Sequence, residues 1–139
     1  MNKENNLMID IRLKNQNVFM GLALHIFHIR LIEIICWINR TFDFILLTET
    51  FRHQTHSNDL HGTKPVRAID IRAWAYQNPI IVVRAINKKF IYDSERPWKK
   101  VAVYHQNNQK DPKANPKTGI GYHLHIQVHP NTRERMNGE

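Results

Sequence analysis

The sequence predicts an α+β fold in which a small antiparallel sheet carries a helix packed on one face. Apolar residues recur at helical spacing between residues 18 and 40, and four later segments are rich in strand-forming residues. Polar stretches with proline or glycine separate these segments. The chain has 139 residues, of which 42% are hydrophobic, so it can bury a core and is expected to form a single domain over residues 1–139.

The first helix is expected at residues 18–40, after a polar N-terminal arm over residues 1–17. Its apolar residues follow one another at steps of three and four, which places them on one stripe of a helix. The stripe consists of Met20, Leu24, Phe27, Leu31, Ile34 and Ile38. His25, His28 and Glu33 lie off the stripe, and such polar residues interrupt the segment too often for a membrane-spanning helix.

The rest of the chain alternates between short strands and polar connections. Strands are expected at residues 42–51, 66–72, 101–105 and 122–128. A second helix is expected to begin near Asn78, with Pro79 in its first turn, and to end near Lys89. Residues 52–65 and 106–121 are expected to form loops, and a charged tail to occupy residues 130–139.

The composition limits the kind of partner and the kind of chemistry that we expect of this chain. Twenty Lys and Arg against 12 Asp and Glu give a net charge of +8, which favours an anionic partner: a nucleic acid, a membrane surface or an acidic wall polymer. The single cysteine, Cys36, excludes an intramolecular disulfide and a cysteine-based zinc cluster. The N-terminus mixes acidic and basic residues and is unlike a signal peptide, so we expect synthesis in the cytoplasm.

The last expected strand places two histidines on one face. Because side chains alternate along a strand, His123 and His125 point to the same side and the apolar residues between them to the other. Two imidazoles fixed on one sheet face can bind a metal, or serve as one ligand and one base. A polar, solvent-facing strand edge would give the same pattern.

Upstream, Asp70 lies on an expected strand whose other face is apolar, where a carboxylate needs a cation, hydrogen-bond donors or a metal. His61 precedes it at a position where the chain can turn. Two neutral imidazoles and one carboxylate are suitable zinc ligands and leave a fourth position for water. Alternatively, Asp70 pairs with Arg67 or Arg72, and His61 is an ordinary loop histidine.

These residues together resemble a known family. Arg52, a His-Gly pair at His61, an Ala-x-Asp triplet ending at Asp70 and the late His125 resemble the LAS-type zinc peptidases. That family includes D-alanyl-D-alanine carboxypeptidases and L-alanyl-D-glutamate endopeptidases of hedgehog-like fold. The resemblance runs over residues 48–129 and is strongest to small phage and prophage members.

The resemblance implies one Zn²⁺ per chain, held by His61, Asp70 and His125. It also implies that His123 is the catalytic base and that Arg52 orients a carboxylate or carbonyl of the substrate. The implied reaction is carboxypeptidase or endopeptidase cleavage of the stem peptide of bacterial peptidoglycan. The enzyme would act at the cell wall after release from the cell.

Two further residues are expected near this site. His105 ends the third expected strand and is a candidate to support a zinc ligand, as neighbouring groups usually do at zinc sites. Tyr122 is a candidate to stabilise the oxyanion beside the metal.

The sequence departs from the family pattern at three points. His61 and Asp70 are nine positions apart, further than is common in the family, and Asp59 stands where a serine is usual. Tyr122 stands where the commoner branch has an acidic base. Either His123 takes the role of that base, or the protein is a zinc-binding relative without catalytic activity.

The late histidine strand also resembles that of single-strand DNA nicking enzymes, and the net charge of +8 suits phosphate binding. Those enzymes need a tyrosine nucleophile, usually on a helix. No tyrosine follows His125, and the first tyrosine of the chain is Tyr76. This alternative leaves Arg52, His61 and Asp70 unexplained. The sequence carries no signal for the oligomeric state.

Overall fold

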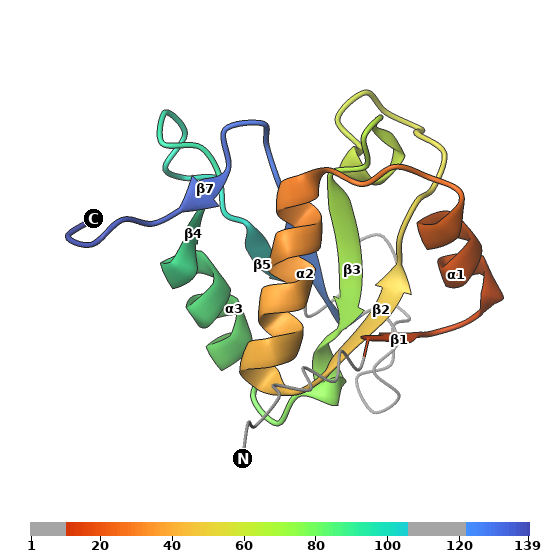
Figure 1. Cartoon of the computed structure of the whole chain (residues 1–139), viewed down its shortest axis with the longest axis horizontal. Helices are drawn as coiled ribbons and strands as arrows, with labels where there is room; N and C mark the ends of the chain where they lie inside the picture. The colour runs from red at the N-terminus through yellow and green to blue at the C-terminus, as the bar shows by residue number, and fades with distance from the viewer. Residues whose placement is uncertain (1–10, 106–121) are drawn as a thin grey trace, which may run out of the picture.

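The computed structural model describes residues 11–105 and 122–139, and its centre is a five-stranded sheet (Figure 1). The first ten residues of the expected arm and the expected loop at residues 106–121 lie outside the described part. The strands, in spatial order, are β1 (Ile11–Leu13), β2 (Ile45–Glu49), β3 (Ala68–Arg72), β6 (His123–Gln127) and β5 (Ala102–His105). The prediction of an α+β fold is confirmed.

Within the described residues, three helices and two short turns connect the strands. The helices are α1 (Gln16–Ala23), α2 (Ile29–Phe42) and α3 (Pro79–Lys89), and the 3-10 turns are η1 (Leu60–Gly62) and η2 (Ala73–Ala75). Helices α2 and α3 lie side by side on one face of the sheet (Figure 1). The expected second helix matches α3, whose first residue is Pro79. No helix among the described residues has both the length and the apolar character needed to cross a bilayer.

The expected first helix is wrong in one respect, because the segment forms two helices. Residues 24–28 leave the helical path and pair with Val66, whose N–H donates to the Ile26 carbonyl at 2.9 Å. The Val66 carbonyl in turn accepts from the N–H of His28 at 2.9 Å. The His28 ring then accepts the N–H of Arg30 and caps α2. Backbone pairing with a distant segment therefore outweighs the local helical periodicity.

The sheet is mixed rather than purely antiparallel, which corrects a second expectation. β1 lies within the expected polar arm and pairs with β2 in parallel, whereas β2, β3, β6 and β5 pair antiparallel. The connection from β1 to β2 contains both α1 and α2, and a helical crossover of this kind returns the chain in the same direction.

The expected C-terminal tail also contains regular structure. β7 (Arg133–Glu134) pairs with β4 (Phe90–Ile91) in a small ribbon beside the main sheet. The guanidinium of Arg133 forms two 2.7 Å hydrogen bonds with the carboxylate of Glu139.

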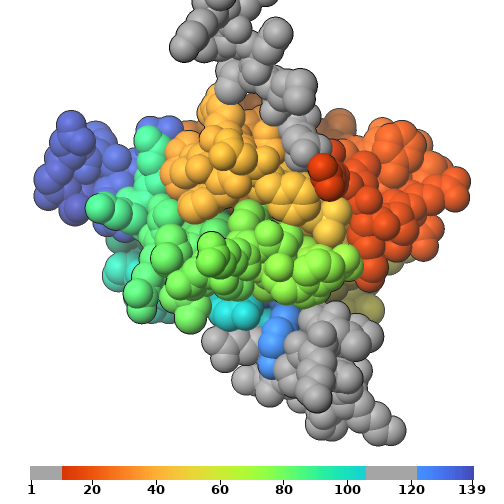
Figure 2. All heavy atoms as spheres, turned by 90° about the horizontal axis from the view of Figure 1, so that it is seen from below, coloured from red at the N-terminus to blue at the C-terminus, as the bar shows by residue number. Residues whose placement is uncertain are grey.

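The core lies between the helices and one face of the sheet. Ile69 and Ile71 of β3 and Leu124 and Ile126 of β6 are fully buried there. They belong to one cluster with the apolar residues of α2 and α3. Seen from below, the green residues of η2 and α3 lie between the orange residues of α2 and the cyan residues of β5 (Figure 2). Alternation along β3 and β6 then directs the intervening side chains to the opposite face of the sheet.

Two leucines that share the expected helical stripe separate in the structure and provide a matched test of the helix break. Leu31 is 0% exposed, whereas Leu24 is 66% exposed. We expect Leu31→Ala to lower the free energy of unfolding by about 2–5 kcal/mol and Leu24→Ala by far less. Urea denaturation followed by circular dichroism measures both, and equal losses would contradict the break between α1 and α2.

Candidate metal centre

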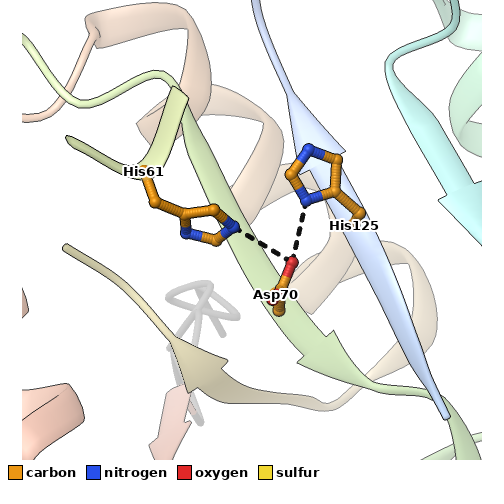
Figure 3. A group of neighbouring side chains, drawn as sticks. All are labelled: His61, Asp70 and His125. Atoms are coloured by element: carbon orange, nitrogen blue, oxygen red, sulfur yellow. Dashed lines mark hydrogen bonds and ion pairs between the residues drawn. The ribbon is translucent and has the colours of Figure 1, made fainter. Parts of the chain in front are cut away.

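Three side chains from three separate elements meet on the sheet face that points away from the helices (Figure 3). They are His61 from η1, Asp70 from β3 and His125 from β6. Asp70 Oδ1 lies 3.3 Å from His61 Nε2 and 2.9 Å from His125 Nδ1. One possible ligand atom of each residue lies within 4.8 Å of the others, so this group can hold a metal ion. The structure thus brings together the three residues expected to bind the metal.

Strand register accounts for the contact between Asp70 and His125. The two residues are direct cross-strand partners of β3 and β6. Opposite residues on an antiparallel pair have Cβ atoms about 4.5–5.5 Å apart. Ile69 and Ile71, which flank Asp70 in β3, point into the core, so Asp70 points away from it. The apolar face of β3 therefore fixes which way the carboxylate points.

A short loop fixes the orientation of His61, which is 1% exposed. Its Nδ1 lies 2.9 Å from the carbonyl oxygen of Thr50. A carbonyl only accepts, so Nδ1 carries the hydrogen and donates it. In the neutral ring, Nε2 then presents a lone pair toward Asp70. A histidine whose second nitrogen donates to a backbone carbonyl is typical of a metal ligand.

His61 Nε2 and Asp70 Oδ1 then form a pair of facing acceptors. Nε2 is buried and has no hydrogen-bond partner, although Oδ1 is only 3.3 Å away. Two acceptors at this distance repel each other unless a cation lies between them. A proton on His61 can supply that charge, and so can a metal ion. The site therefore fits a cation by its own geometry.

The contact between His61 and Asp70 shifts the pKa of both side chains. Burial alone would raise the pKa of the Asp70 carboxyl, but the His125 and His61 rings beside it hold that pKa well below its ordinary value. Burial alone would lower the pKa of His61, but the contact with Asp70 outweighs it and raises that pKa. Asp70 is therefore ionised at neutral pH and supplies the negative charge that a bound cation needs.

Two more histidines lie on the open side of the group. His123 Nε2 is 3.8 Å from Asp70 Oδ2, and its side chain is 29% exposed. His105 is the cross-strand partner of His123, and their ring centroids lie 4.9 Å apart. The His105 ring is also 6.0 Å from that of His125. Burial and the neighbouring histidines lower the pKa of His105. Both residues thus lie beside the candidate centre, as expected.

The structure does not bring Tyr122 to this site. Tyr122 packs against the core cluster, as does Leu124, two positions along the chain. Alternation therefore places it on the opposite side of the sheet from His123. The expectation that Tyr122 stabilises an oxyanion beside the metal has no geometric support.

Arg52 has a different environment from the one expected. Its guanidinium holds both oxygens of Asp59, at 3.1 and 3.3 Å. Asp59 in turn accepts the backbone N–H of His61 at 3.2 Å. The backbone N–H of Arg52 also donates to the His61 carbonyl at 3.2 Å. The structure therefore shows Arg52 positioning the loop that carries His61.

Two groups that hold the loop of His61 in place are not among the expected site residues, namely the side chain of Asp59 and the carbonyl of Thr50. Asp59 caps η1, and its position two residues before His61 is a recognisable cap signal. The Thr50 carbonyl orients His61 through the backbone, so no side-chain pattern reveals it. Gly62 allows the loop to close, because a Cβ there would lie 2.6 Å from the Arg52 carbonyl oxygen.

The alternative in which Asp70 pairs with Arg67 or Arg72 is wrong for the described part of the chain. The recorded partners of Asp70 are His61, His123 and His125. Arg72 instead lies over the ring of Trp74, with its guanidinium carbon 4.6 Å from the centroid.

The three expected ligands give the first prediction for the site. We expect His61→Ala, Asp70→Asn and His125→Ala each to abolish stoichiometric zinc binding, because each removes one of three donors. His56→Ala, in the exposed part of the same loop, is the matched control and should keep one zinc per chain. Elemental analysis after dialysis measures the metal content, and zinc retained by all three variants would refute the centre.

The contact between Asp59 and the N–H of His61 gives the second prediction. We expect Asp59→Ala to weaken zinc binding roughly tenfold or more, since groups that orient a ligand usually contribute that much. Glu49→Ala is the control, because Glu49 also faces Arg52, at 3.8 Å, but does not cap η1. Competition with a chromophoric chelator gives the affinities. Equal values for the two variants would contradict a role for Asp59 in positioning His61.

No model of a known protein family, no curated protein and no solved structure matches this chain. The candidate metal centre is accordingly defined by its own possible donors, namely two imidazoles and one carboxylate. Imidazole nitrogen and carboxylate oxygen are usual ligands of Zn²⁺, although other divalent ions compete for the same donors.

Proposed function

We propose that this protein is a zinc-dependent peptidase that cleaves the stem peptide of bacterial peptidoglycan, as a member of the LAS-type group. The observation that carries the proposal is the buried pair of facing acceptors, His61 Nε2 and Asp70 Oδ1, completed by His125. Such a pair needs a cation, and three protein ligands leave a fourth position for water. The choice of substrate rests on the sequence motif around these residues.

The zinc ion would supply an acidified water, whose pKa it lowers toward neutrality. His123 lies beside the ligand group, with a side chain that is 29% exposed, and in this proposal it would accept a proton from the attacking water and pass it to the leaving amine. Asp70 Oδ2 lies 3.8 Å from His123 Nε2, so the proposed base lies directly beside the ligand group. The residues around the site therefore divide into ligands and a base.

A non-catalytic zinc-binding protein is the second candidate, and two observations favour it. The guanidinium of Arg52 is occupied by Asp59. Tyr122 packs against the core instead of the site. Two of the groups expected to assist catalysis are therefore engaged elsewhere, and only His123 remains as a candidate base.

Single-strand DNA nicking is disfavoured by the tyrosines. The chain has four, and all four pack in or against the hydrophobic core. They are Tyr76, Tyr92, Tyr104 and Tyr122. A nicking enzyme needs a tyrosine hydroxyl beside its histidine pair. Tyr104 and Tyr122 share the core-facing alternation of Leu124, and the Tyr76 hydroxyl donates to the Phe44 carbonyl, so these three lie away from the histidine pair.

The proposal predicts a separation between metal binding and turnover. We expect His123→Ala to keep one zinc per chain and to lower peptide cleavage by about 10²–10⁴-fold, the usual contribution of a general base. We expect His125→Ala to lose both zinc and cleavage. Fragment release from purified peptidoglycan measures turnover, and elemental analysis measures zinc.

The same experiment decides between the candidates. A wild-type protein that binds zinc but releases no fragments would overturn the peptidase and favour the non-catalytic protein. Equal loss of zinc in His123→Ala and His125→Ala would show that His123 is a ligand and not the base. His53→Ala, an exposed histidine of the neighbouring loop, serves as the control for general effects of losing an imidazole.

A further inference from the structure

A cavity of about 300 Å³ lies beside the candidate metal centre. Four segments line it: the loop before η1 together with the first residue of η1, the segment just before β3, the end of β6, and the connection between β4 and β5. The lining residues that matter here are Leu60, Arg67, Tyr92, Arg96, Lys99 and Gln127.

Three cationic side chains line this cavity without enough carboxylates to balance them. Arg96 donates from Nε to Asp93 Oδ2 at 3.0 Å, which pairs one positive charge. Within residues 11–105 and 122–139, no carboxylate lies at ion-pair distance from Arg67 or Lys99. Two uncompensated cations in a concave site concentrate positive potential there, so the cavity attracts an anion.

The ring of Tyr92 helps to hold two of these cations in place. The Arg96 guanidinium carbon lies 5.7 Å from its centroid, and Lys99 Nζ lies 5.9 Å from it. Tyr92 itself is buried, and its carbonyl accepts the Thr132 hydroxyl at 2.8 Å. The two charges are thus arranged on a fixed ring.

The cavity borders the metal centre on two sides. Leu60 lines it and is adjacent in sequence to the candidate ligand His61. Gln127 lines it and lies two residues beyond His125 on the same face of β6. A two-residue step along a strand spans about 6.6–6.8 Å. An extended peptide with a carbonyl at the metal centre can therefore place a group one or two residues further along in this cavity.

We propose that this cavity binds the terminal carboxylate of the peptide substrate, with Arg67, Arg96 and Lys99 as the recognising cations. The inference rests on the proposed function, since it assumes a peptide bond positioned at His61, Asp70 and His125. A guanidinium matches the planar carboxylate in a two-point contact. Asp59 already occupies the guanidinium of Arg52, so the cations of the cavity are the ones open to such a ligand.

The test compares two synthetic peptides that differ only at the terminus. N-acetyl-L-Lys-D-Ala-D-Ala and its C-terminal amide are titrated calorimetrically into the full chain carrying His123→Ala, in which turnover is expected to be slow. We expect the acid to bind about 10–100-fold more tightly than the amide, the usual effect of losing hydrogen bonds to a charged group. Adding Lys99→Ala or Arg67→Ala should remove most of that preference.

Lys100→Ala is the matched control for the loss of one positive charge. Lys100 follows Lys99 in the same exposed segment, but it does not line the cavity, and its Nζ donates to the Pro97 carbonyl at 3.2 Å. This variant should retain the preference for the acid. A loss of preference as large as that of Lys99→Ala would show a general charge effect and overturn the site.

Parallel measurements separate the failure of this inference from failure of the proposed function. Preferential binding of the acid without cleavage by the wild-type chain would keep the carboxylate site and reject the peptidase. Cleavage by the wild-type chain, together with equal binding of acid and amide, would keep the peptidase and reject the carboxylate site.

Two further ligands test whether another anion is the partner. Inorganic phosphate that displaces the peptide more effectively than acetate does would overturn the assignment to a carboxylate. A single-stranded oligonucleotide whose binding depends on Lys99 and Arg67, with acid and amide binding alike, would overturn it in favour of nucleic-acid phosphate.

Discussion

Asp70 is 8% exposed, and an ionised carboxylate in that position is unfavourable unless neighbouring groups compensate its charge. Three histidines do so, from η1 and β6, with nitrogen atoms 2.9 to 3.8 Å from its oxygens. The antiparallel register of β3 and β6 sets two of those contacts, and the loop held by Arg52 and Asp59 sets the third. The register of two strands and the conformation of one loop thus keep this carboxylate charged.

The sheet keeps stability and chemistry on different faces. The face toward α2 and α3 carries the apolar residues of β3 and β6. The other face carries Asp70, the two histidines of β6 and Gln127, so the candidate metal centre and the neighbouring cationic cavity share one surface. Substitutions on that surface remove little apolar packing, which is why changes in metal or anion binding there can be separated from changes in folding.

The residues of the site were predictable where the signal was local. Alternation along β6 places His123 and His125 on one face, and the same rule places Asp70 opposite the core. The same alternation predicts that Tyr122 faces the core, because Tyr122 lies two residues before Leu124. The expectation that Tyr122 acts at the site followed the family resemblance instead, and it has no geometric support. The orientation of His61 was not predictable, because a backbone carbonyl of Thr50 provides it.

The fold, like the site, was predictable where the signal in the sequence was local. The boundaries of α3 follow from Pro79 and the polar residues around it. The break between α1 and α2 depends on pairing with Val66, far away in sequence, so local periodicity could not show it. The short parallel strand β1 likewise depends on the crossover through two helices.

The order of strands in the sheet has a consequence for assembly. β6 is the last of the five strands along the chain, yet it lies between β3 and β5. Until it inserts, both neighbours expose unpaired backbone edges, which are sites of aggregation in partly folded chains. His125 arrives on this inserted strand, so a metal ion that binds the completed site favours the closed sheet by mass action. Metal availability during synthesis would then influence the yield of folded protein as well as its chemistry.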